Sequence, residues 1–266
     1  MSAPEELFQQ GKLTEAIAAQ TAVVKARPGD VIARTQLVEL LCISGNLERA
    51  DTQLEAVLAQ SPAHLHGAAL LRQLIRAEQA RRDFWTAGRV PEFTAPPSEP
   101  ARLALEASIR LRERDFAGAA ALLAAAAEAR AALPGSIDGR PFDDLIDLDD
   151  RTSGVIEVLT PTGKYYWLEF AQVERIEFEA PERGLDLCWR AARIDVRSGP
   201  SGAVYVPAVY APAEGDSDAH RLARATDWVE LAPGGPTRGQ GQRMWLAGDD
   251  ATPLLEIGVV EFAARA

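Results

Sequence analysis

The feature that most constrains the fold is a repeat near the start of the chain. The segment 11–16 (GKLTEA) recurs at 45–50 (GNLERA), and Pro28 recurs at Pro62. The offset of 34 residues is the period of the tetratricopeptide helix-turn-helix repeat. Glycine permits the turn between the paired helices, alanine lets the helices approach closely, and proline ends the second helix. The spacing therefore predicts a stack of helical pairs.

Apolar residues at helical spacing extend this stack. A third helix, which includes Leu65 and Leu74, is expected to break before Pro91. The segment 91–100 holds four prolines and is typical of a loop. Two more helices are expected at 103–112 and 116–133. We assign residues 1–134 to a tetratricopeptide-like helical domain, a kind of stack that commonly binds a peptide or helix in a groove but also serves as plain scaffold.

An acidic, turn-rich segment at 135–152 is expected to be a linker. Its aspartates could instead form a metal site, because hard cations prefer several carboxylate ligands. A metal-dependent hydrolase is therefore an alternative function. The spacing matches no calcium-binding loop, so we favour a linker and expect no metal. The aspartates in question are Asp143, Asp144, Asp147, Asp149 and Asp150.

From residue 153 onward the hydrophobic period changes from helical to alternating. Residues 155–159 and 164–170, joined by the turn 160–163, read as a hairpin. Further strands are expected at 175–179, 187–196, 203–210, 228–231, 243–246 and 254–262. The fold class is therefore α+β, with residues 153–266 forming a β-rich domain that is barrel-like or a curved antiparallel sheet. Pro207 suggests an edge or bulge.

Four tryptophans fall in this β-rich half, and most stand beside a charged or amide residue. They could form a recognition surface, because aromatic and arginine side chains dominate interface hot spots. They could equally form a core in which arginine–carboxylate pairs tie loops together, which is the interpretation we favour. The four residues are Trp167, Trp189, Trp228 and Trp245.

The order of motifs in this half resembles the ImpE/TagJ family, also called SciE-type virulence proteins. The resemblance rests on VIEVL at 155–159, YYW at 165–167, RIEF at 175–178, DLCWRAAR at 186–193, VPAVY at 206–210, RATDW at 224–228 and GQGQRM at 239–244. It ends with LEI at 255–257 and VEF at 260–262. The motif positions that we single out, and expect to be structural, are Tyr165, Trp167, Trp189, Arg190, Tyr210, Asp227, Trp228, Gln242 and Arg243.

This resemblance implies a cytoplasmic accessory protein of a bacterial type VI secretion system. Some family members bind the N-terminal helix of the small sheath subunit (TssB, or VipA), which links them to sheath assembly or to recycling by the ClpV ATPase. The family supplies no catalytic residues. We therefore expect a non-enzymatic adaptor, with a purely structural module as another alternative, and we cannot assign the partner-binding residues from sequence.

The remaining sequence features agree with this expectation. His64, His66 and His220 lack metal-ligand spacing, and no nucleotide or nucleophile motif is present, so we expect no cofactor. A glycine-rich run at 239–243 precedes a strand and is interpreted as a turn. Cys42 and Cys188 are expected to be buried thiols. The net charge of −11 disfavours nucleic acid and anionic membranes as partners.

Overall fold

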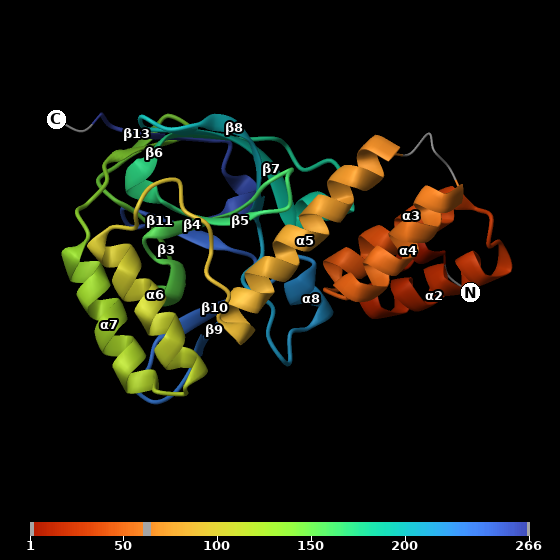
Figure 1. Cartoon of the computed structure of the whole chain (residues 1–266), viewed down its shortest axis with the longest axis horizontal. Coiled ribbons are helices and arrows are strands. Elements are labelled where there is room, and N and C mark those ends of the chain that lie inside the picture. The colour runs from red at the N-terminus through yellow and green to blue at the C-terminus, as the bar shows by residue number, and fades with distance from the viewer. Residues whose placement is uncertain (1–2, 61–64, 265–266) are drawn as a thin grey trace.

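The computed structural model describes residues 3–60 and 65–264, and it confirms the α+β class (Figure 1). A helical half is followed by a β-rich half. Pro62 and His64 lie outside the described residues, as does the side chain of His66. The helices of the first half are α1 (Pro4–Gln9), α2 (Leu13–Ala26), α3 (Val31–Ile43), α4 (Leu47–Gln60), α5 (Leu65–Ala87), α6 (Glu99–Arg112) and α7 (Phe116–Ala129).

The 34-residue period corresponds to two equivalent turns, each of which joins two helices. Gly11, between α1 and α2, has a φ of 80°, and Gly45, between α3 and α4, has a φ of 81°. This left-handed conformation favours glycine because a side chain there would be strained. The leucine and alanine that follow each glycine are buried in the same apolar cluster. The repeat thus encodes one helix-packing contact, used twice.

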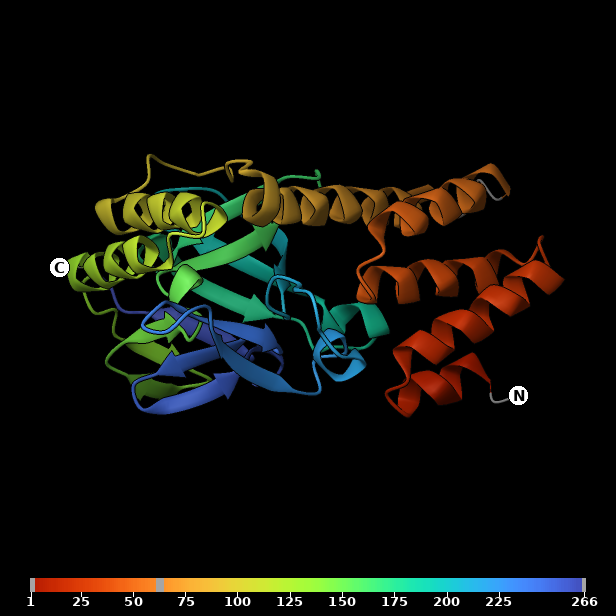
Figure 2. The same cartoon turned by 90° about the horizontal axis from the view of Figure 1, so that it is seen from below.

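Helix α5 joins the two halves of the molecule (Figure 2). Its early turns pack on α4, and it also packs on strands β4 (Val155–Leu159) and β5 (Tyr165–Glu169). The α6–α7 hairpin lies beside the β-rich half, where α6 contacts the 3₁₀ turn η2 (Asp150–Thr152). The described helices include none long and apolar enough to cross a bilayer.

The main sheet is antiparallel, in the order β2-β1-β13-β6-β7-β8-β4-β5. Its edge strands β2 and β5 do not pair with each other, so the sheet does not close into a barrel. Two smaller sheets, β10-β9 and β12-β11-β3, complete this half. The strands not yet given are β1 (Gly135–Ile137), β2 (Arg140–Phe142), β3 (Leu145–Asp147), β6 (Val173–Phe178), β7 (Trp189–Val196), β8 (Ser201–Pro207), β9 (Thr226–Glu230), β10 (Thr237–Gly241), β11 (Met244–Ala247), β12 (Asp250–Pro253) and β13 (Val259–Phe262).

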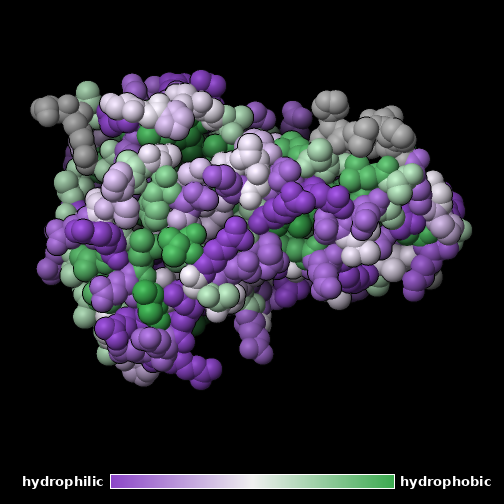
Figure 3. All heavy atoms as spheres, viewed as in Figure 1, coloured by the Kyte–Doolittle hydropathy of each residue, from purple (hydrophilic) through white to green (hydrophobic). Residues whose placement is uncertain are grey.

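Two large apolar clusters stabilise the fold, and a third, small one lies between α6 and α7. One runs from the repeat helices through α5 to the face of β4 and β5 that contains Val155, Leu159 and Trp167. The other lies within the β-rich half and includes Ile156 and Trp245. Strand β4 is buried on both faces because it lies between these clusters. On the face seen in Figure 3, hydrophobic areas are separate patches among hydrophilic side chains.

The structure differs from the sequence-based expectation in the segment 135–152. This segment is not a solvated linker: β1 pairs with β13, β2 pairs with β1, and β3 pairs with β11. Asp147 and Asp149 in it are only 1% exposed. Strand pairing with residues about a hundred positions later left no local signal in the sequence. The division of the chain into independent domains stays a prediction.

Three smaller expectations in the β-rich half were also wrong. The glycine-rich run contains strand β10 rather than only a turn. The single strand expected at 254–262 is divided into a 3₁₀ turn, η5 (Leu254–Glu256), and β13. Pro207 is not at a sheet edge: it ends β8, opposite Trp189 of β7, within the eight-stranded sheet.

A candidate partner-binding groove and the buried charges beside it

The repeat helices and the β-rich half together enclose a groove of about 590 Å³. Helices α1, α2 and α3 supply most of its walls, and one segment of the β-rich half closes it. Both apolar and polar residues line it. The residues that line it are Ala3, Pro4, Glu5, Phe8, Gln9, Gln20, Val23, Arg27, Asp30, Ile32, Ala33, Gln36, Glu39, Leu40, Ile43, Glu182 and Gly184.

The closing segment is the 3₁₀ turn η4 (Gly184–Leu187) and the residues before it. Leu185 is 3% exposed and belongs to the apolar cluster of the repeat helices. Gly184 lies so close to α1 and α3 that a Cβ there would be 3.1 Å from Phe8 Cζ and 3.5 Å from Ile43 Cδ1. Asp186 holds the turn, because its Oδ2 accepts the backbone N–H groups of residues 182 and 183. The β-rich half therefore forms a wall of the groove.

A buried charge cluster fixes α5 against the sheet and so holds the two halves together. Its centre is Glu157 on β4, which is 1% exposed. Arg81 on α5 donates to both carboxylate oxygens, from Nε at 3.0 Å and from an NH2 at 2.8 Å. Arg243 donates to the same carboxylate and to Asp147, the latter at 2.6 Å. The Tyr165 hydroxyl also donates to Glu157, at 2.6 Å.

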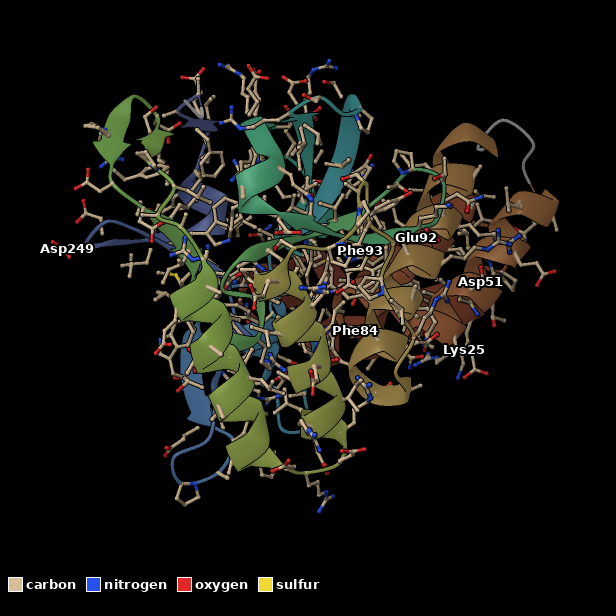
Figure 4. All side chains as sticks on the ribbon, turned by 60° about the vertical axis from the view of Figure 1, so that its left-hand side comes forward. Lys25, Asp51, Phe84, Glu92, Phe93 and Asp249 are labelled. Carbon is tan, nitrogen blue, oxygen red and sulfur yellow. The ribbon has the colours of Figure 1, made fainter. Side chains whose placement is uncertain are left out.

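Aromatic side chains surround this cluster. Trp85 Nε1 donates to Glu157, and Trp167 Nε1 donates to the Tyr165 hydroxyl at 2.6 Å. Phe84 packs edge-on against Trp167, with ring centroids 4.9 Å apart. In Figure 4 the labelled Phe84 lies on the side of α5 toward the sheet, whereas Lys25 and Asp51 lie at the outer surface of the helical half. The cluster is thus shielded from water.

Burial raises the pKa of both acids of the cluster, whereas the neighbouring arginines lower it. Burial would raise the pKa of Glu157, but Arg81 and Arg243 together hold that pKa below its usual value. Burial raises the pKa of Asp147 to about 7, although Arg243 opposes the shift. Glu157 is therefore the ionised centre, and Asp147 is the acid whose charge is costly to bury.

Five of the family-motif residues belong to this cluster or its surroundings. Tyr165, Trp167 and Arg243 are in it. Trp189 donates from Nε1 to Glu78, which also pairs with Arg81. Arg243 lies over the ring of Tyr210, 5.2 Å from its centroid.

The other motif residues lie elsewhere. Arg190 donates to the backbone carbonyls of Glu179 and Leu254. Asp227 accepts a short contact from His220 at the surface, and Trp228 is 43% exposed. The backbone N–H of Gln242 donates to the carbonyl of Ala225. The function of the motif positions stays a prediction, but most of them are packed inside the protein.

Four of the five aspartates of 143–150 each have a partner of their own. Asp144 pairs with Arg130, Asp147 with Arg243, and Asp149 with Arg151, while Asp150 accepts the backbone N–H of Thr237. Asp143 is exposed. Within the described parts of the chain, no group of three or more potential ligands is placed to hold a metal ion.

Sequence reasoning missed the residues that matter most here: Glu39 in the groove, and Glu78 and Arg81 in the cluster. A buried arginine or glutamate on an amphipathic helix looks like any solvated charge in a linear sequence. The one available signal was Glu157, a glutamate within the otherwise apolar strand 155–159. An acid in such a run needs a buried cation as partner.

Comparisons with known proteins place the chain among type VI secretion components. Residues 139–261 match the family described as ImpE protein, and residues 7–74 match the tetratricopeptide repeat. The chain is 31% identical to the type VI secretion system accessory component TagJ of Pseudomonas aeruginosa, over 97% of this chain and 90% of that protein.

The fold is also similar to a crystal structure. A protein from Vibrio parahaemolyticus superposes with a TM-score of 0.93 at 28% sequence identity, covering 98% of both chains. The similarity therefore includes the helical half, the β-rich half and their relative placement.

Proposed function

The chain belongs to the ImpE/TagJ family of type VI secretion accessory proteins, and we propose that it is a non-enzymatic adaptor. Its partner in this proposal is the N-terminal helix of the small sheath subunit, TssB or VipA. A link to the ClpV ATPase would be indirect, through that sheath subunit.

The observation that carries the proposal is the groove along the repeat helices. Amphipathic helices are commonly recognised by grooves that offer an apolar floor between polar edges. This groove has both features, since Phe8, Leu40 and Ile43 lie beside glutamates and glutamines. The buried charge cluster, by contrast, offers no free acceptor to a ligand, because arginine, tyrosine and tryptophan donors already bind the carboxylate of Glu157. It supports the packing of α5, and we assign it no chemistry.

Calorimetry with the full chain tests the proposal. The ligand is a synthetic peptide of the N-terminal helix of the cognate small sheath subunit. We expect saturable binding with one peptide per chain. The matched control is the same peptide with its apolar face replaced by serine, which should not bind. If the unmodified peptide gives no heat and causes no stabilisation of the chain, the proposal is wrong.

A structural module without a partner is the second candidate. It is favoured by the η4 turn, which already fills part of the space beside α3 with residues of the chain itself. The same titration separates the two candidates, because a purely structural module predicts no binding of either peptide.

A further inference from the structure

We infer that the partner helix binds in a composite groove made by α1–α3 and residues 182–184, and that it places a basic side chain against Glu39. This inference rests on the proposed function and names the surface and the chemistry that the partner must have. It also gives the β-rich half a direct role, as one wall of the binding site.

The groove has room and an apolar surface that is still open. Its volume of about 590 Å³ lies within the usual range of ligand-binding clefts. Ile32, at the start of α3, is 68% exposed although it is a large apolar residue. Phe8 of α1 is only partly buried. A partner that offers apolar side chains at helical spacing would cover both residues.

The charge of the groove is strongly unbalanced. Four acids line it, and the one basic residue in its lining, Arg27, already pairs with Asp30 at 3.2 Å. Three acids remain without such compensation by the lining: Glu5, Glu39 and Glu182. Complementary charge is the usual basis of specificity across an interface. The partner face must therefore be apolar at its centre and basic at its edges.

Glu39 is the acid that points most directly to a missing cation. It lies on α3 between this groove and a neighbouring cavity of about 320 Å³, and it is partly buried. Among the described residues, its carboxylate has neither a salt bridge nor a hydrogen bond. Burial raises its pKa, and the charge of Arg183 offsets this only in part. A cation that arrives with the ligand and lies close to this carboxylate would stabilise its charged form.

Charge reversal in the full chain tests the inference with the same sheath peptide. We expect Glu39→Lys to weaken binding by about tenfold or more, because like charges that face each other across an interface repel. Glu182→Lys should weaken it by about threefold, since exposed pairs contribute less. The controls are Glu55→Lys on the outer side of α4 and Glu174→Lys on β6. Both residues are exposed and neither lines the groove.

Reversing charges on the peptide tests directly whether one of its basic residues contacts residue 39. Each basic residue of the peptide is replaced in turn by glutamate, and one of these replacements should restore binding to the Glu39→Lys chain. If the peptide binds the unmodified chain but Glu39→Lys and Glu182→Lys behave like their controls, the inferred groove is wrong and the adaptor function stands. If the peptide does not bind the unmodified chain, the proposed function itself fails.

Discussion

Arg81 of α5 forms a two-pronged ion pair with Glu157 of β4, with N–O distances of 3.0 and 2.8 Å and both side chains 1% exposed. The pair joins the last helix of the repeat stack to a strand that is buried on both faces. Its position explains how the groove keeps its composite wall. The pair helps to hold the β-rich half, and with it the η4 turn, against the helical half.

Replacing Glu157 with glutamine should destabilise the protein by about 3–5 kcal/mol, because it leaves Arg81 and Arg243 buried without their shared counter-charge. Urea unfolding followed by far-UV circular dichroism measures this change. The matched control is Glu174→Gln, an exposed position on β6, where little change is expected. A loss for Glu157→Gln no larger than that of the control would contradict the assigned role of the pair.

Asp147 should make the stability depend on pH between about 4 and 7. Its pKa is about 7 in the folded state and near 3.8 when unperturbed, so the folded state binds this proton more tightly. Its contribution to stability is therefore full below about pH 4, falls as the pH rises, and is level above about pH 7. Chemical unfolding at several pH values should show the unmodified chain losing stability relative to Asp147→Asn across that window. The exposed Asp143→Asn should run parallel to the unmodified chain.

Gly239→Ala should destabilise the protein by about 1–3 kcal/mol, the usual cost of overpacking. A Cβ at this position would lie 2.2 Å from Cε2 of the Tyr210 ring, which packs against Trp228. Gly202→Ala is the control, because a Cβ there meets nothing within 4 Å. Thermal unfolding of both variants measures the difference. Equal melting temperatures would mean that Tyr210 moves away at no cost.

The two halves should unfold together, since one apolar cluster and the Arg81–Glu157 pair cross their boundary. Far-UV circular dichroism reports mainly on the helices, whereas tryptophan fluorescence reports on the junction, through Trp85 and Trp167, and on the β-rich half, which holds the other three tryptophans. We expect the two signals to give the same urea midpoint. Separate midpoints would indicate that the halves are independent domains and would support the division at residue 134.

The sequence indicated several residues of the buried charge cluster but not their partners on α5. The motif residues Tyr165, Trp167 and Arg243 were singled out, and arginine–carboxylate pairs lie around them in the core. The expectation of a core position was wrong for Trp228, which is 43% exposed. The partners on α5 were not predicted, because Glu78 and Arg81 follow the same helical pattern that exposed charges follow. The glycine-rich run was misread because a close approach to Tyr210 leaves no mark on neighbouring residues.

The sequence by itself determined the helical repeat, the β hairpin at 155–169 and the family. Each of these can be recognised from the spacing of residues in the sequence: the 34-residue period of the repeat, the alternating pattern of the hairpin and the short motifs of the family. Only the tertiary structure decided where the aspartates point, which acids are buried and what closes the groove. Arg81 and Glu157 are 76 residues apart, and Asp147 and Arg243 are 96 apart. The free energy of such pairs depends on burial and on the partner's position, and the neighbouring residues in the sequence indicate neither.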